Sequence, residues 1–157
     1  MFTETMNLKI EVAEIFEDRK KFLPLLLLAD EQESMIDKYL ECGRMFILQE
    51  KNISVAVCVV ADVGDKILEI KNLAVDKKFQ RKGYGRFMIE FVSQKFKDKF
   101  SILQVGTGDS PATLPFYESC DFKRHHVIKN FFIDNYDHKI FEGGVQLADM
   151  IILRKTL

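Results

Sequence analysis

The sequence has 157 residues, of which 47% are hydrophobic and 30% charged, with a formal net charge of −1. This length predicts one domain with a sizeable core over residues 1–157, and the balanced charge provides no overall field to draw the protein to nucleic acid or a membrane. The three cysteines have no paired spacing, and no signal-peptide pattern or membrane-spanning run is visible, so we expect a reducing, cytoplasmic location without disulfides or thiolate-bound metal.

The first third of the chain predicts strands and helices in alternation. The expected elements are a strand over residues 8–14, helices over 16–29 and 32–42, and strands over 44–49 and 53–61. Pro24 marks the point where firm helix begins, because proline suits a first helical turn, and Gly43 is expected to end the second helix. The strand over 53–61 is almost entirely apolar, which is typical of a central strand buried on both faces.

Residues 68–75 predict a further strand whose apolar positions change parity. Leu68 and Ile70 occupy even positions, whereas Leu73 and Val75 occupy odd ones. A strand changes face only where an extra residue is inserted, so we expect a β-bulge in its middle unless both faces are buried. A bulge would matter because the backbone N–H it leaves unpaired can bind a substrate carbonyl.

A basic, glycine-containing segment follows this strand and opens a long helix predicted to reach Phe100. Its sequence is Gln80-Arg81-Lys82-Gly83-Tyr84-Gly85-Arg86. The glycines allow backbone N–H groups to approach an anion closely, and the helix adds the positive end of its dipole. The three basic side chains add further positive charge, so the segment predicts a phosphate site.

Three kinds of phosphate site can be compared with this segment. A Walker loop requires Gly-Lys-Ser/Thr, but Lys82 precedes Gly83 and no Ser or Thr follows. A dinucleotide site requires three glycines after the strand, and only two are present. The third pattern, Gln-x-x-Gly-x-Gly, fits Gln80 to Gly85 and resembles the coenzyme A signature of the GNAT N-acetyltransferase superfamily. Taken alone, the six residues would favour a glycine-rich turn with a solvated basic face, and it is the rest of the chain that favours the coenzyme site.

The second half of the chain follows the same layout as this superfamily. The expected elements are a strand over residues 101–105, a loop over 106–111, a helix through 116–118, and strands over 125–133 and 145–154 joined by 134–144. The run from Gly106 to Phe122 resembles one branch of the family. Asp109 and Asp121 depart from it, because Asn and Gly usually stand there, although aspartate tolerates turn geometry.

The resemblance implies an α/β fold with a mixed, splayed central sheet flanked by helices, acting with acetyl-CoA as cosubstrate and without a metal. It implies that Leu73, Ala74 and Val75 pair with the pantetheine arm of the coenzyme. The pyrophosphate would lie on the backbone amides of residues 81–86. The full set of implied coenzyme contacts is Leu73, Ala74, Val75, Gln80, Arg81, Lys82, Gly83, Tyr84, Gly85, Arg86, Asp109, Ser110 and Phe116.

Acetyl transfer to an amine requires a base for the ammonium and an acid for the departing thiolate. In similar enzymes a tyrosine at the place of Tyr117 is the general acid, and some relatives have the general base at the place of Glu69. Tyr117 could instead be a half-buried core residue, and Glu69 a solvated strand carboxylate. Backbone carbonyls and water could also remove the amine proton.

The acceptor is expected to be a small-molecule or peptide amine, and a homodimer is possible. Adjacent His125 and His126 are expected to face opposite sides of a strand and so not to share a metal. His138 lies in an aromatic, acidic loop that could contact a cationic amine or be a plain surface loop. The alternative function is a non-catalytic acyl-CoA sensor or assembly partner. A third hypothesis, nucleic-acid binding through residues 77–86, has little support because the basic patch is short.

Overall fold

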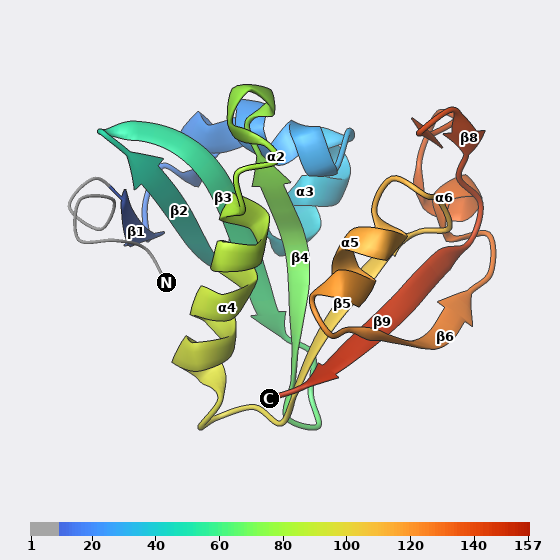
Figure 1. Ribbon diagram of the computed structural model, residues 1–157. Coiled ribbons are helices and arrows are strands. Elements are labelled where there is room, and N and C mark those ends of the chain that lie inside the picture. Colours follow the sequence, from blue (N-terminus) through green and yellow to red (C-terminus); the bar gives the residue numbers. More distant parts are fainter. Residues whose placement is uncertain (1–9) are drawn as a thin grey trace. The chain divides into compact units, whose positions relative to one another are not determined.

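The computed structural model describes residues 10–157 (Figure 1). The start of the predicted opening strand, at Leu8, lies outside the described residues. The helices are η1 Arg19–Phe22, α2 Leu23–Ala29, α3 Glu33–Leu40, η2 Lys77–Phe79, α4 Tyr84–Phe96, α5 Leu114–Ser119 and α6 Phe131–Asn135. The strands are β1 Ile10–Ile15, β2 Arg44–Glu50, β3 Ile53–Asp62, β4 Ile67–Val75, β5 Ile102–Gly108, β6 Lys123–Ile128, β7 Phe141–Glu142, β8 Val145–Gln146 and β9 Met150–Thr156.

Seven of these strands form one mixed sheet in the order β1-β2-β3-β4-β5-β9-β6, and β7 and β8 form a separate hairpin. The β4–β5 pair is parallel, while β1–β2, β2–β3, β5–β9 and β9–β6 are antiparallel. The expected α/β class, a mixed sheet flanked by helices, is confirmed. The chain divides into two compact units, and the expectation of a single domain stays a prediction. The first unit holds the described residues up to Ala61 with Lys71–Gln94, and the second holds Asp62–Ile70 with Lys95–Leu157.

The first unit buries apolar side chains on both faces of its strands. One core joins α2 and α3 to the sheet, and its members are Leu25, Leu26, Ile36, Tyr39, Leu40, Met45, Ile47, Val57, Val59 and Ala74. On the opposite face of β2, the Phe46 ring meets Phe91 of α4 edge-on, with ring centres 5.4 Å apart. Strand β3 is buried from Val55 to Val60, as its apolar run predicts. Pro24 lies in the first turn of α2, also as expected.

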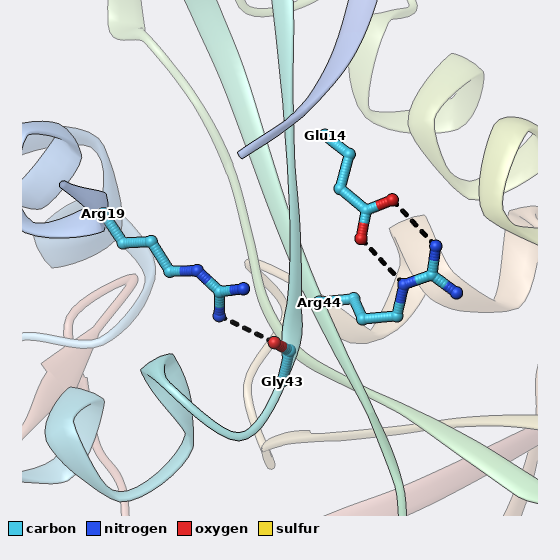
Figure 2. Close-up of polar contacts among 4 residues, drawn as sticks. All are labelled: Glu14, Arg19, Gly43 and Arg44. Carbon is cyan, nitrogen blue, oxygen red and sulfur yellow. Dashed lines mark hydrogen bonds and ion pairs between the residues drawn. The ribbon is translucent and has the colours of Figure 1, made fainter. Parts of the chain in front are cut away.

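Arg19 of η1 closes the C-terminal end of α3 (Figure 2). The side chain is 9% exposed, and its Nη1 donates to Leu40 O and, at 2.7 Å, to Gly43 O. Leu40 is the last residue of α3, whose terminal carbonyls have no partner within the helix. Arg19 therefore takes the place of a C-terminal cap and joins η1 to the α3–β2 connection. Arg44, also in Figure 2, binds Glu14 of β1 through two bonds of 2.7 Å.

Arg19→Met is expected to lower the free energy of unfolding by about 2 to 3 kcal/mol, because two buried carbonyls lose a charged donor. Arg44→Met is the matched control, since the Arg44 side chain is 44% exposed and keeps contact with water. It should cost about 1 kcal/mol or less. Chemical denaturation followed by circular dichroism measures both. Equal losses would show that the Arg19 contacts add nothing beyond an ordinary surface ion pair.

The second unit is built on β5, β9 and β6 with α5. Residues of β5 pair with β9 from Ile102–Thr156 to Gly108–Met150. The first four residues of β4 pair with β5, from Ile67–Ile102 to Ile70–Val105. The buried side chains of this unit include Leu103, Val105, Leu114, Tyr117, Cys120, Phe122, Ile140, Leu147, Ile151, Ile152 and Leu153.

Several predicted boundaries are wrong. Helix α4 ends at Phe96 rather than near Phe100, and a turn follows in which Lys99 N and Phe100 N both donate to Phe96 O at 3.0 Å. The strand predicted over 125–133 ends at Ile128, since Asn130 adopts a left-handed conformation (φ 56°) and precedes α6, which begins at Phe131. The strand predicted over 145–154 is interrupted between β8 and β9.

The loop predicted over 106–111 is also wrong at its start, because Gly106, Thr107 and Gly108 belong to β5. Side chains from the 147–150 segment pack closely on both glycines. A β-carbon on Gly106 would lie 2.5 Å from Met150 Sδ, and one on Gly108 would lie 2.5 Å from Leu147 Cδ1. The glycines thus let the side chains of the 147–150 segment rest on the β5 backbone. Within residues 10–157, no helix is long and apolar enough to cross a membrane.

Candidate active site

Strand β4 carries four of the predicted site residues, Glu69 and the run 73–75. Its burial alternates without interruption, with Leu68, Ile70, Asn72 and Ala74 buried and the residues between them half-buried. The predicted change of face in the middle of the strand is therefore wrong. The parity of the apolar residues shifts because the polar Asn72 occupies a buried position.

Asn72 ties the second half of β4 to the helices of the first unit. Its side chain is 3% exposed, and Nδ2 donates to Leu26 O and to Tyr39 Oη, both at 3.0 Å. Tyr39 Oη donates in turn to Asp30 Oδ2 at 2.9 Å. Burial, followed by the Asp30 carboxylate, raises the pKa of Tyr39, so the phenol keeps the proton that this bond needs. This chain of bonds fixes the strand immediately before Leu73.

The basic loop after β4 has the backbone geometry of an anion site. Arg81 and Gly83 both have positive φ, 64° and 87°. A β-carbon on Gly83 would meet no atom within 4 Å, so the dihedral and not a lack of space calls for glycine. Left-handed residues in such a loop let successive N–H groups point to one side, where they can bind an anion. Gly83 O accepts from Phe87 N at 2.9 Å, so the loop leads directly into α4 and the positive end of its dipole.

The side chains of this loop have two different roles. Those of Gln80, Arg81, Lys82 and Arg86 are exposed, and Gln80 Nε2 donates to Val75 O at 3.0 Å, which closes the loop onto the end of β4. Tyr84 is 4% exposed, and its hydroxyl donates to Glu50 at the end of β2. Burial and then Glu50 raise the pKa of Tyr84 to about 12. The Tyr84 side chain therefore attaches the start of α4 to β2. The backbone of Tyr84 is the part of this residue that can contact a ligand.

The predicted contacts Asp109 and Ser110 follow the end of β5 and differ in exposure. Asp109 is exposed, whereas Ser110 is 3% exposed and donates through Oγ to Glu142 Oε1 of β7 at 2.7 Å. Thr113 Oγ1 donates to the same carboxylate oxygen at 3.2 Å. Glu142 thus holds the β7–β8 hairpin to the β5–α5 loop. The Ser110 hydroxyl acts in this internal contact, and its expected role toward the coenzyme stays a prediction.

Tyr117 lies on α5, which has Pro115 in its first turn. The Tyr117 side chain is 8% exposed, and its ring packs edge-on against Phe116 and Phe122, with centres 5.1 and 5.6 Å away. The ring is therefore held rigidly within the second unit. Asp121, two residues after the end of α5, has φ 72°, so aspartate adopts here the left-handed conformation for which glycine is usual.

Glu69 is half-buried and lies opposite Gln104 in the parallel β4–β5 register. Its Oε1 accepts a hydrogen bond from Gln104 Nε2 at 3.0 Å. Glu69 is thus a partly exposed strand carboxylate with a partner on β5, and its role as general base and the alternative of a solvated carboxylate both stay predictions.

The sequence predicted that the adjacent His125 and His126 face opposite sides of β6, and this prediction is wrong. The β6–β9 register shifts between Arg124 and His126, so His125 is the extra residue of a bulge. As a result His125 Nδ1 lies 2.7 Å from His126 Nδ1. His138 instead contacts its neighbour Asp137, at 2.6 Å, in the exposed loop before β7. Among the described residues, no group of three or more His, Cys, Asp or Glu side chains is placed to hold a metal ion.

This set of residues can be compared with known proteins. A family model described as an acetyltransferase (GNAT) domain matches residues 41–124. A curated relative, the uncharacterized N-acetyltransferase YvbK of Bacillus subtilis (strain 168), is 32% identical over 149 residues, which cover 94% of this chain and 95% of that protein. The chain belongs to the GNAT acetyltransferase family.

Solved structures agree with this GNAT assignment. A GNAT family acetyltransferase from Elizabethkingia anophelis, solved with acetyl-CoA bound, has a TM-score of 0.90 and 34% identity, covering 95% of this chain and 99% of its own. An acetyltransferase from Bacillus subtilis in complex with CoA has a TM-score of 0.85 and 30% identity, again covering 95% and 99%. The expected family and fold are thereby confirmed.

Sequence reasoning missed two polar residues of this GNAT acetyltransferase that contact predicted site residues, and a third that contacts one of these two. Gln104 contacts Glu69, Arg154 contacts Gln104, and Glu142 contacts Ser110. The one local signal was a glutamine inside an otherwise apolar strand, since Gln104 is flanked by Leu103 and Val105. A buried polar residue requires hydrogen-bond partners, but the sequence does not say which ones.

Proposed function

We propose that this GNAT acetyltransferase transfers the acetyl group of acetyl-CoA directly to a primary amine of a small molecule or peptide, in the cytosol. The observation that carries the proposal is the loop that opens α4, in which Arg81 and Gly83 are left-handed and four polar or basic side chains are exposed. This loop has the charge and backbone form required by a pyrophosphate. The acetyl-CoA bound to the Elizabethkingia anophelis relative supports this choice of ligand.

The proposed reaction needs three proton transfers in addition to coenzyme binding. Glu69 takes a proton from the ammonium form of the acceptor, and the freed amine attacks the thioester carbonyl. The tetrahedral intermediate then expels the coenzyme thiolate, to which Tyr117 gives a proton, and the nitrogen releases its second proton to solvent as the neutral amide forms; solvent then reprotonates Tyr117. The backbone of residues 73–75 would pair with the pantetheine arm, and residues 80–86 would hold the pyrophosphate.

Gly83→Val is expected to weaken binding of acetyl-CoA about tenfold or more. A β-branched residue is a genuine outlier at φ 87°, so the loop would leave its present conformation and binding would have to restore it. Restoring a left-handed residue costs about 1 to 2 kcal/mol, and 1.4 kcal/mol corresponds to a tenfold change in affinity. Calorimetric titration with acetyl-CoA measures the change.

Gly64→Val is the matched control for this substitution. Gly64 has φ 94° and, like Gly83, no atom within 4 Å of an added β-carbon, but it lies in the turn before β4. It should lose similar stability and retain full affinity for acetyl-CoA. Equal affinity of the wild type and Gly83→Val would place the coenzyme phosphates elsewhere.

A panel of amines, screened by release of free coenzyme thiol, tests the transfer itself. Polyamines, aminoglycoside-like amines, amino acids and peptide N-termini would form the panel. Turnover of any amine distinguishes an enzyme from an acyl-CoA sensor of the same fold. Tight acetyl-CoA binding without turnover across all these classes would favour the sensor.

A further inference from the structure

A row of hydrogen-bonded polar side chains crosses β4, β5, β9 and β6 within the second unit. Glu69, Gln104 and Arg154 are register partners on three adjacent strands. Glu69 Oε1 accepts from Gln104 Nε2 at 3.0 Å, and Gln104 Oε1 accepts from Arg154 Nε at 2.8 Å. The row continues to β6, where Arg154 Nη1 lies 3.3 Å from His125 Nε2. Gln104 itself is 8% exposed, so its amide depends on these two partners.

The chemistry of the neighbours determines the orientation of the Gln104 amide. A guanidinium only donates hydrogen bonds, and an ionised carboxylate only accepts them. The amide oxygen must therefore face Arg154 and the amide nitrogen must face Glu69. The reversed amide would direct two donors at each other on one side and two acceptors on the other. Arg154 thus decides which atom Gln104 presents to Glu69.

The same reasoning extends to the histidine at the end of the row. Arg154 can only donate to His125 Nε2, so this imidazole is neutral and carries its proton on Nδ1, which donates to His126 Nδ1. Partial desolvation, Arg154 and His126 lower the pKa of His125, which agrees with a neutral ring. The bulge in β6 brings His125 to this position and gives Arg154 its second partner.

We propose that Gln104, oriented by Arg154, is a positioning residue that holds the Glu69 carboxylate in one orientation for proton abstraction. This inference rests on the proposed role of Glu69 as general base. A carboxylate on a half-buried strand can rotate about its terminal bonds, and a donor fixed on the neighbouring strand limits that rotation. Positioning matters because a misplacement of about 1 Å can cost on the order of 10²-fold in rate.

The test compares Gln104→Met and Gln104→Glu with the exposed control Gln94→Glu on α4, which adds the same charge in the first unit. Gln104→Met keeps the length of the side chain but loses the donor, and should lower kcat roughly ten- to a hundredfold with an unchanged KM for acetyl-CoA. Gln104→Glu places a second carboxyl beside Glu69, and two such groups share a proton. The acid limb of the kcat/KM profile should therefore move to higher pH by about one unit or more.

A second measurement does not depend on activity. Carboxyl carbons of ¹³C-labelled glutamate, followed by NMR, should show coupled titration of residues 69 and 104 in Gln104→Glu and no such coupling in Gln94→Glu. Coupled titration together with the shifted limb supports the proposal. A wild-type limb in Gln104→Glu and a wild-type rate in Gln104→Met would overturn it, even when Glu69→Gln is inactive. A fully active Glu69→Gln with coupled titration would show that the contact is real and that the proposed base is wrong, and the positioning role would fall with it.

Discussion

Tyr117→Phe is expected to lower kcat by about 10²- to 10⁴-fold, which is the typical contribution of a general acid to the rate of such a step. The substitution removes only the hydroxyl and keeps the ring that packs against Phe116 and Phe122. Affinity for acetyl-CoA should remain nearly unchanged, because the proton is transferred in the transition state and not in the bound ground state. Steady-state kinetics with the best acceptor of the amine panel, under conditions where chemistry limits the rate, measures the loss.

Two observations on the same variant separate catalysis from folding. Thermal unfolding should change little, since the buried ring is retained, and calorimetric titration should give wild-type affinity for acetyl-CoA. A variant with these properties and full turnover would remove Tyr117 from the reaction. The thiolate would then leave without a protein acid, and the hydroxyl would serve only the core of the second unit.

Glu69→Gln is expected to lower kcat/KM by roughly 10²-fold or more and to flatten the rise of the rate toward basic pH. Glutamine cannot accept a proton at these pH values, but its amide oxygen can still accept the hydrogen bond from Gln104 Nε2. The fold should therefore persist while the base is lost. A pH–rate profile from the acid limb to the plateau, measured beside the wild type, provides the comparison.

Glu11→Gln on β1 is the control for loss of one exposed strand carboxylate. It should retain the wild-type rate and profile. If Glu69→Gln also kept both, the amine would be deprotonated by water or backbone carbonyls. The contact with Gln104 would then be structural.

Features encoded by a few consecutive residues were predictable from the sequence. The period of apolar residues indicated the strands and helices, and the start of α2 near Pro24 followed from the fixed φ of proline. The Gln80–Gly85 pattern predicted a glycine-containing loop at the start of α4, and Gly83 in this loop has φ 87°, a local conformation that favours glycine. Each of these signals lies within a few neighbouring residues, so no knowledge of the rest of the chain is needed to read it.

Other features depended on residues far apart in the sequence. Gly106 and Gly108 suggested a loop, yet they lie in β5 because their backbone pairs with Ile152 and Met150 of β9. Asn72 suggested a change of face, yet it is buried, and its Nδ2 donates to Leu26 O and Tyr39 Oη. The local sequence pattern indicates which conformation and burial a residue prefers, but it does not identify the distant partner that changes that preference.

The sequence by itself therefore determined the family, the order of the strands and α-helices up to α5, and the loop that we propose binds the coenzyme phosphates, whereas α6 and the β7–β8 hairpin were not predicted. Only the tertiary structure decided which polar groups support the predicted acid and base. Gln104 and Arg154 are 50 residues apart, and Ser110 and Glu142 are 32 apart. Gln104 and Arg154 meet through the β5–β9 register, and a shift of a single residue would turn each side chain to the other face of the sheet. Strand register is set by the packing of the whole unit, so it cannot be predicted from a short segment of sequence.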